Sequence, residues 1–248
     1  MSLITILLLL SLVVFVTHAL EAITGFGCTV LAFPFVIAIT GDIGYSKIIL
    51  TIIAWALALY FVVTKFRRIN WKQFLVIFVV AAIGLPIGIW IFDKVDAAIL
   101  KKALGAFIVI SAGIQLWKIY RPAKKENPGG KFNPVNYAYL FFGGIVHGAF
   151  ATGGPLIVLY SAKKLTDKGE FRATMCLLWT LLNTLLIVQF FRNGALTREV
   201  GVTLLWLLPA LALGIVVGEI VHKKVNELIF RKIVFATLFA VGLVMVIW

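Results

Sequence analysis

Long apolar stretches alternate with short polar segments along the whole chain of 248 residues. The eight apolar stretches cover residues 2–40, 46–66, 71–92, 99–117, 134–162, 172–191, 199–221 and 228–248. A helix needs about 20 residues to cross the hydrocarbon core of a bilayer, and most of the stretches fit one crossing each. The pattern therefore predicts an all-α membrane protein, a polytopic bundle of helices.

Two of the stretches are too long for one crossing, and each is interrupted in its middle. Residues 2–40 contain the sequence TGFG at 24–27, and residues 134–162 contain ATGGP at 151–155. Glycine and proline weaken or end helices. We therefore expect each stretch to form a broken or re-entrant hairpin, with two helical arms joined by an unwound tip, and three spanning helices to follow each hairpin.

The basic residues support this topology. If both long stretches are hairpins, 17 Lys and Arg residues meet one face of the membrane, in segments 65–72, 118–131, 163–172 and 223–232. The other face receives six, which are Lys47, Lys94, Lys101, Lys102, Arg192 and Arg198. With single broken crossings the two faces receive 11 and 12, and the bias vanishes. The positive-inside rule favours hairpins, with both termini outside the cytoplasmic (inner) membrane.

The two halves of the chain match when one is shifted by 126 residues. Gly27 then meets Gly153, Gly88 meets Gly214, and Glu21 meets His147. Each half has five membrane segments, an odd number, so the second half enters the bilayer from the opposite side. The sequence predicts an inverted-topology repeat, with a first repeat at 1–120, a basic cytoplasmic linker at 121–133 and a second repeat at 134–248.

Composition agrees with this class of protein. Apolar residues make up 62% of the chain, charged residues 13%, and the mean hydropathy is +1.07, so lipid must cover most of the surface. The net charge of +13 lies in the loops and needs no nucleic-acid partner. Cys28 and Cys176 form no metal-binding pattern, and we expect two buried thiols. Motifs of nucleotide-binding proteins and intramembrane enzymes are missing, so neither catalysis nor a cofactor is expected.

The two tips are the predicted substrate site. Unwound backbone at membrane depth is costly unless it lines a cavity, and matched interruptions in inverted halves point to a transport site. The second arm of each hairpin presents a helix N-terminus with free N–H donors, which suits a small oxyanion. The alternative is that the glycines only allow close helix contact. The candidate substrate-binding residues are Thr24, Gly25, Phe26, Gly27, Cys28, Thr29, Thr152, Gly153, Gly154 and Pro155.

Three ionisable residues near the tips are candidates for coupling transport to protons. Glu21, His18 and His147 lie in the first arms of the hairpins, and ionisable groups at membrane depth are functional candidates by default. The alternative is that they reach water and are merely hydrated. Arg172 opens the sixth apolar stretch, where it either guards substrate access or, as the default, anchors the helix at the inner face.

The tips resemble the glycine-rich motif, of the type G-F-G-G-G-x-L-x-x-P, that the TauE/SafE family of sulfite exporter-like permeases shows near the start of each half. The first copy here is GFGCTVLAFP at residues 25–34, and the second is GIVHGAFATGGP at 144–155. Cys28 stands where the motif has glycine, and Tyr160 is the repeat mate of Pro34. The resemblance covers essentially the whole chain and implies transport of sulfite, organosulfonates or related anions, coupled to ions.

Together these observations predict a secondary-active transporter for a small anion, which the resemblance narrows to a sulfur oxyanion or sulfonate. The expected coupling ion is H⁺, and the protein is expected to act as a monomer or homodimer in the lipid bilayer. A passive anion channel using the same donors is the alternative, as is a carrier for organic anions without sulfur. The substrate and the direction of transport stay open.

Overall fold

The computed structural model describes residues 2–25, 27–120, 134–221 and 227–247, and the secondary structure in these residues is helical throughout. The helices are α1 (Leu3–Thr24), α2 (Cys28–Thr40), α3 (Ile43–Lys65), the 3₁₀ helix η1 (Phe66–Arg68), α4 (Trp71–Lys94), α5 (Ala97–Tyr120), α6 (Pro134–Phe150), α7 (Gly154–Lys164), α8 (Lys168–Arg192), α9 (Arg198–Val221) and α10 (Glu227–Ile247). Six of the described helices are long and apolar enough to span a membrane, which confirms the predicted fold class. The predicted linker and Phe26 lie outside the described residues.

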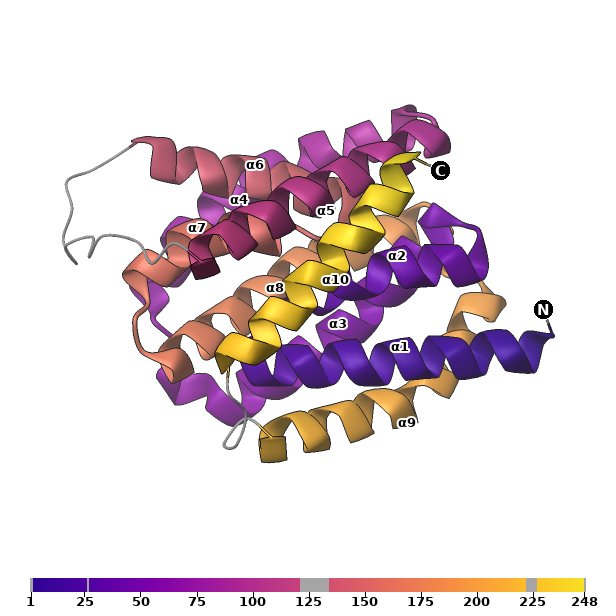
Figure 1. The fold of residues 1–248 in the computed structure, drawn as a ribbon, viewed down its shortest axis with the longest axis horizontal. Helices are drawn as coiled ribbons and strands as arrows, with labels where there is room; N and C mark the ends of the chain where they lie inside the picture. Colours follow the sequence, from indigo (N-terminus) through magenta and orange to yellow (C-terminus); the bar gives the residue numbers. More distant parts are fainter. Residues whose placement is uncertain (1, 26, 121–133, 222–226, 248) are drawn as a thin grey trace.

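Both long apolar stretches turn back on themselves (Figure 1). α2 packs against α1, and α7 packs against α6. α1 is long enough to cross a membrane, whereas α2 and α7 have 13 and 11 residues. At 1.5 Å per residue these second arms are about 20 and 17 Å long, shorter than a hydrocarbon core of about 30 Å. The second arms therefore begin inside the molecule, where the chain leaves each tip.

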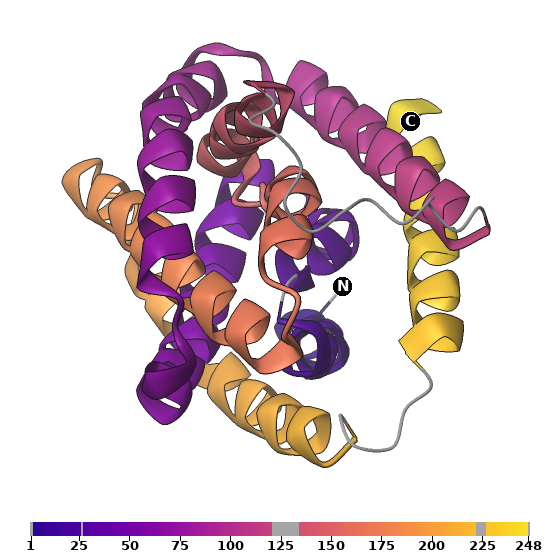
Figure 2. The same cartoon turned by 90° about the vertical axis from the view of Figure 1, so that its left-hand side faces the viewer.

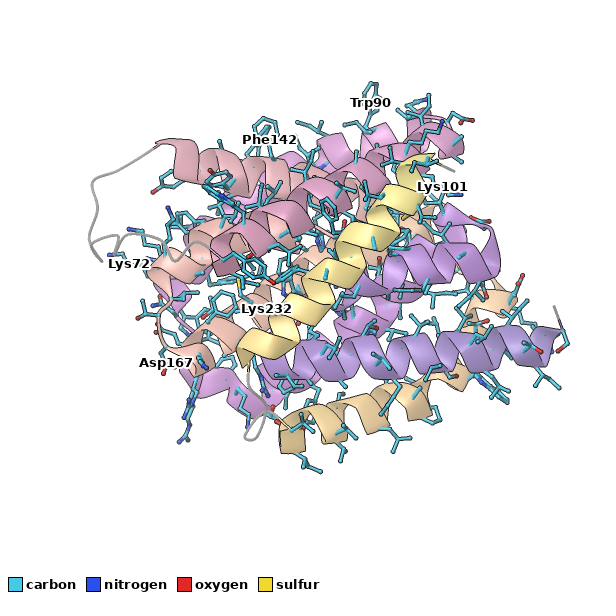
Figure 3. The ribbon with its side chains drawn as sticks, in the orientation of Figure 1. Lys72, Trp90, Lys101, Phe142, Asp167 and Lys232 are labelled. Atoms are coloured by element: carbon cyan, nitrogen blue, oxygen red, sulfur yellow. The ribbon has the colours of Figure 1, made fainter. Side chains whose placement is uncertain are left out.

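The helices run roughly along the long axis, so their connections gather at two ends of the molecule. α1 begins and α10 ends at one end, whereas α5 ends and α6 begins at the other (Figure 1). Lys72 and Asp167, beside the α3–α4 and α7–α8 connections, lie at this second end, and Lys101 lies at the first (Figure 3). Two connections rich in basic residues thus share one end, as the charge pattern predicts.

The short arms occupy the middle of the molecule when it is viewed along this axis (Figure 2). α2 and α7 lie there, and most of their residues are buried. α3 and α8 pack together, and the indole Nε1 of Trp55 donates a hydrogen bond to Thr184 Oγ1 at 2.9 Å. α5 and α10 pack against each other along one flank. The helices around the two short arms therefore hold the tips away from lipid.

Glycines allow the first arms to approach the spanning helices of the other half. A Cβ atom at Gly88 of α4 would lie 1.9 Å from the backbone oxygen of Ile145 in α6, and one at Gly148 would lie 2.1 Å from the oxygen of Leu85. On the other side of the molecule, a Cβ at Gly214 of α9 would lie 2.9 Å from the oxygen of Phe15 in α1. These glycines are needed for contact between helix backbones, as small residues are in membranes.

We expect Gly88→Ala to destabilise the protein strongly, because its methyl group would overlap the α6 backbone. Overpacking of this kind costs about 1–3 kcal/mol or more. Gly113→Ala in α5 is the matched control, because its Cβ would meet only the Phe239 ring at 3.5 Å, an ordinary contact. The measurement is the melting temperature of both variants in detergent. Equal melting temperatures would contradict the close contact of α4 and α6.

Candidate functional site

The first tip is a turn that glycine makes possible. α1 ends at Thr24, and Gly25 follows in the left-handed conformation with φ of 83°. The N–H of Gly25 donates to the Glu21 carbonyl at 2.7 Å, which closes the last turn of α1. Gly27, with φ of 102°, then precedes the first residue of α2. Two left-handed residues within three positions explain the glycines here, because side chains rarely tolerate this conformation.

The second tip repeats the first of these two left-handed positions, with a less suitable residue. Ala151 is left-handed with φ of 53°, and its N–H donates to the His147 carbonyl at 2.7 Å. Ala151 and His147 lie 126 residues after Gly25 and Glu21, the shift predicted from sequence. A left-handed residue other than glycine costs about 1–2 kcal/mol, so this tip carries backbone strain. α7 begins at Gly154, with Pro155 in its first turn and no side chain capping its N-terminus.

The two tips meet at one small cavity. The cavity is lined by Glu21, Gly27, Thr29, Val30, Ala54, His147, Ala151, Thr152, Gly154, Trp179 and Asn183. Its volume is about 20 Å³, which is room for one or two water molecules. A sulfur oxyanion has four or more non-hydrogen atoms and does not fit in this space. The tips must therefore move apart before such an anion can bind between them.

Glu21 already uses the helix N-terminus that was predicted to bind an anion. Its Oε2 accepts a hydrogen bond from the N–H of Cys28, the first residue of α2, at 2.8 Å. The Glu21 side chain is 3% exposed. A carboxyl group at a helix N-terminus is favoured by the helix dipole and satisfies a backbone donor. An external anion at this position must compete with the side chain of the protein itself.

The second tip offers unpaired polar groups instead. The Oγ1 of Thr152 and the Nδ1 of His147 are buried and have no hydrogen-bond partner. His147 Nε2 lies 3.0 Å from Asn183 Oδ1, and its ring stacks on Trp179 at 5.5 Å between centroids. Trp179 also donates from Nε1 to the carbonyl of Gly25 at 3.4 Å. α8 thus contacts both tips through one tryptophan.

The structure brings together some of the predicted residues and leaves others aside. Glu21, Gly27, Thr29, His147, Thr152 and Gly154 line the cavity, whereas Gly25, Cys28, Gly153, Pro155 and His18 are outside its lining. The side chain of Thr24 lies outside the description, as does Phe26. His18 is buried, with Nδ1 2.9 Å from the Val14 carbonyl. Among the described residues, no three His, Cys, Asp or Glu side chains gather as a metal site.

The predicted site leaves out five residues of the cavity lining, which are Val30, Ala54, Ala151, Trp179 and Asn183. In the sequence Trp179 is typical of a packing or interface residue, and Ala54 carries no signal, because alanine is common in membrane helices. Asn183 lines the cavity and also contacts His147 of α6, so it combines the roles of a cavity residue and a polar contact between helices. A mid-helix polar residue is the signal that identifies it.

The fold and this cavity define a polytopic membrane protein with two hairpin tips that meet inside the bundle. The chain belongs to the family described as sulfite exporter TauE/SafE, whose model matches residues 10–245. It is therefore a membrane transporter by family. No solved structure matches it.

Two curated relatives are similar over most of the chain. A probable inner membrane transporter protein, TsaS of Comamonas testosteroni, is 24% identical over 183 residues, which cover 72% of this chain and 73% of the relative. A probable sulfite/organosulfonate exporter, TauE of Cupriavidus necator, is 21% identical over 234 residues, covering 90% of this chain and 86% of the relative.

We expect Glu21→Ala to lower the stability of the protein, because the Cys28 N–H would lose its acceptor inside the bundle. An unsatisfied buried donor costs about 1–3 kcal/mol. Glu21→Gln is the matched control, because its amide oxygen can accept the same hydrogen bond. The melting temperature in detergent should fall for Glu21→Ala and change much less for Glu21→Gln. Equal values for the two variants would show that the cap is unimportant.

Proposed function

We propose that this protein is a secondary-active transporter that moves sulfite, an organosulfonate or a related sulfur oxyanion across the cytoplasmic membrane, coupled to protons. One observation carries the proposal: tips from matching positions of the two halves line a single cavity with Glu21 and His147. The names of the two relatives support sulfur anions as the substrate class and the inner membrane as the location. The direction of transport is left open.

The donors at the second tip suit an anion. The Thr152 hydroxyl is buried and has no hydrogen-bond partner, although buried polar groups are normally paired. A bound anion would supply the missing acceptor. The N-terminus of α7 lacks a side-chain cap and adds the positive end of a helix dipole. In a cavity that excludes most water, these groups attract an oxyanion more strongly than they would at a surface.

The small cavity favours a carrier over a passive channel. A channel for anions needs a path wide enough for the ion, whereas a carrier encloses its site between two gated states. A cavity that holds one or two waters is too small, as it stands, to conduct an anion of this size. The transport cycle then requires the tips to separate toward one face at a time.

Glu21 gives this carrier a means of coupling. When Glu21 is a carboxylate, it accepts the hydrogen bond of the Cys28 N–H and repels an approaching anion. Once protonated, it no longer repels the anion and can yield the helix N-terminus to it. The anion and the proton then move together, and His147, at the matching position of the other tip, relays the proton or contacts the anion. His18, buried in α1 outside the cavity lining, is a weaker candidate for the relay.

The first experiment is solid-supported-membrane electrophysiology on the purified protein in liposomes, with and without a pH gradient. The anions are sulfite, sulfate, thiosulfate, taurine, sulfoacetate and lactate. We expect a current for a sulfur oxyanion or sulfonate that changes with the gradient. Thr152→Val, which removes the unpaired hydroxyl and keeps the shape, should weaken the apparent affinity about tenfold, the factor expected for one lost hydrogen bond to a charged group.

The matched control for this variant is Thr180→Val. Thr180 is also buried, within α8, but its hydroxyl donates to the Cys176 carbonyl and does not line the cavity. Its affinity should match that of the unmodified protein. Silence for every anion with a folded protein would refute the sulfur-anion assignment, and a current for lactate alone would favour an organic-anion carrier. Equal affinities in both threonine variants would remove Thr152 from the site.

The coupling role of Glu21 predicts a separate result. In Glu21→Gln the side chain is permanently neutral, so we expect anion flux to persist while its dependence on the pH gradient is lost or shifted. The measurement is the initial current at fixed anion concentration from pH 5 to 8. Gln115→Leu in α5, a buried polar residue outside the cavity lining, serves as the control for a general effect of altering the helix bundle. An unchanged pH profile in Glu21→Gln would exclude Glu21 from coupling.

A further inference from the structure

Among the side chains that the structure describes, two cationic ones are buried inside the bundle. Lys47 in α3 is 1% exposed, and Arg172 in α8 is 9% exposed. From the sequence, Lys47 is predicted to be a loop cation, and Arg172 to be an anchor or a guard of access. The structure corrects the first interpretation, because Lys47 lies in the second turn of α3 and is enclosed by protein. Buried cations in membrane helices are costly and usually functional.

Each cation holds the first arm of the hairpin in the other half of the chain. Lys47 Nζ donates to the Gly148 carbonyl of α6 at 2.9 Å, and Arg172 Nη1 donates to the Ala22 carbonyl of α1 at 2.8 Å. Gly148 lies 126 residues after Ala22, the shift that relates the two tips. Both carbonyls belong to the last turn of their helices, where backbone acceptors lack partners within the helix.

The surroundings of the two cations also match. Lys47 Nζ lies 3.7 Å from the centre of the Phe92 ring, and the guanidinium of Arg172 lies 3.8 Å from that of Phe61. Such cation–π contacts stabilise desolvated charges. Arg172 also forms an ion pair with Glu219 of α9 at 3.1 Å. Asp93, which lies 126 residues before Glu219, directly follows Phe92 in α4, the residue whose ring Lys47 contacts.

The two cations lie on opposite sides of the cavity. Ala54 of α3 lines the cavity, and it is seven residues after Lys47 and seven residues before Phe61, against which Arg172 lies. Seven helical residues span about 10 Å. One cation is therefore placed between the cavity and the end of the bundle where α3 begins, and the other between the cavity and the end where α3 finishes.

We infer that Lys47 and Arg172 are a pair of latches, one on each side of the site, that hold the hairpin tips closed. Each latch joins a helix of one half to the hairpin of the other half. Movement of the halves that opens the cavity toward one end must break the latch at that end and can leave the opposite latch intact. This inference rests on the proposed transport cycle and assigns two positioning residues to it.

The test measures access to the cavity without needing the substrate. The reporter is Ala54→Cys in a background with Cys28→Ser and Cys176→Ala, labelled by a membrane-impermeant methanethiosulfonate reagent applied from one face of a vesicle at a time. Lys47→Gln should raise the labelling rate from the face nearer Lys47 about tenfold, the factor expected for losing a hydrogen bond to a charged group. Arg172→Gln should do the same from the opposite face.

Conservative variants separate a latch from a merely structural role. Lys47→Arg and Arg172→Lys keep a cationic donor and should return labelling from both faces toward the rate of the background protein. A structural role alone predicts that both glutamine variants alter both faces alike. That result, or unchanged rates in folded glutamine variants, would overturn the inference. Because labelling needs no transported anion, loss of the sulfur-anion assignment would leave this test intact.

A second pair of variants protects the test if the glutamine variants fail to fold. Glu219→Gln removes the acid paired with Arg172, and Asp93→Asn removes the acid that follows Phe92, whose ring Lys47 contacts. Neither acid is buried. Glu219→Gln should raise labelling from the face nearer Arg172, and Asp93→Asn should raise it from the face nearer Lys47, each by less than the corresponding cation variant. Equal labelling from both faces in both acid variants would also overturn the inference.

Discussion

Backbone N–H and C=O groups inside a membrane need hydrogen-bond partners within the protein, because lipid offers none. The rest of this structure depends on how the two broken hairpins supply these partners. At each tip a left-handed residue closes the preceding helix with its own N–H, and the turn places the N-terminus of a short helix inside the bundle. The groups that the breaks expose then find partners far away in sequence, in Glu21, Lys47 and Arg172. The cavity lies between the two tips that these contacts hold in place.

The two tips meet the requirement differently, and that asymmetry is central to the proposed mechanism. The first tip has glycine at its left-handed position and a carboxyl group that caps α2. The second has a strained alanine, an uncapped α7, and a histidine where the first has its glutamate. With two uncapped tips, anion binding would not depend on the protonation of a capping side chain. In the proposed mechanism, the single capped tip makes anion binding depend on the protonation of Glu21, because its negative charge repels the anion.

The contacts between the halves suggest how the same elements move. α1 packs along α9, and α4 packs along α6, so each hairpin leans on a spanning helix of the opposite half through glycine contacts. Close backbone contacts of this kind slide or tilt as rigid units, because little side-chain volume separates the helices. The polar contacts at the two ends, rather than the apolar ones along the helices, are then the contacts that a change of access breaks and remakes.

Local features of the sequence predict the helices, the two interruptions, the hairpins and most of the tip residues that line the cavity, because hydropathy and the conformational freedom of glycine act locally. The 126-residue shift already paired Glu21 with His147 and Gly25 with Ala151. The assembled fold is needed to show that Trp179 and Ala54 complete the cavity, that Glu21 caps α2 at Cys28, and that Lys47 is enclosed by protein. Those facts depend on how helices distant in sequence approach one another. A lysine near the end of an apolar stretch gives the same sequence pattern whether it lies in a loop or is buried in the core.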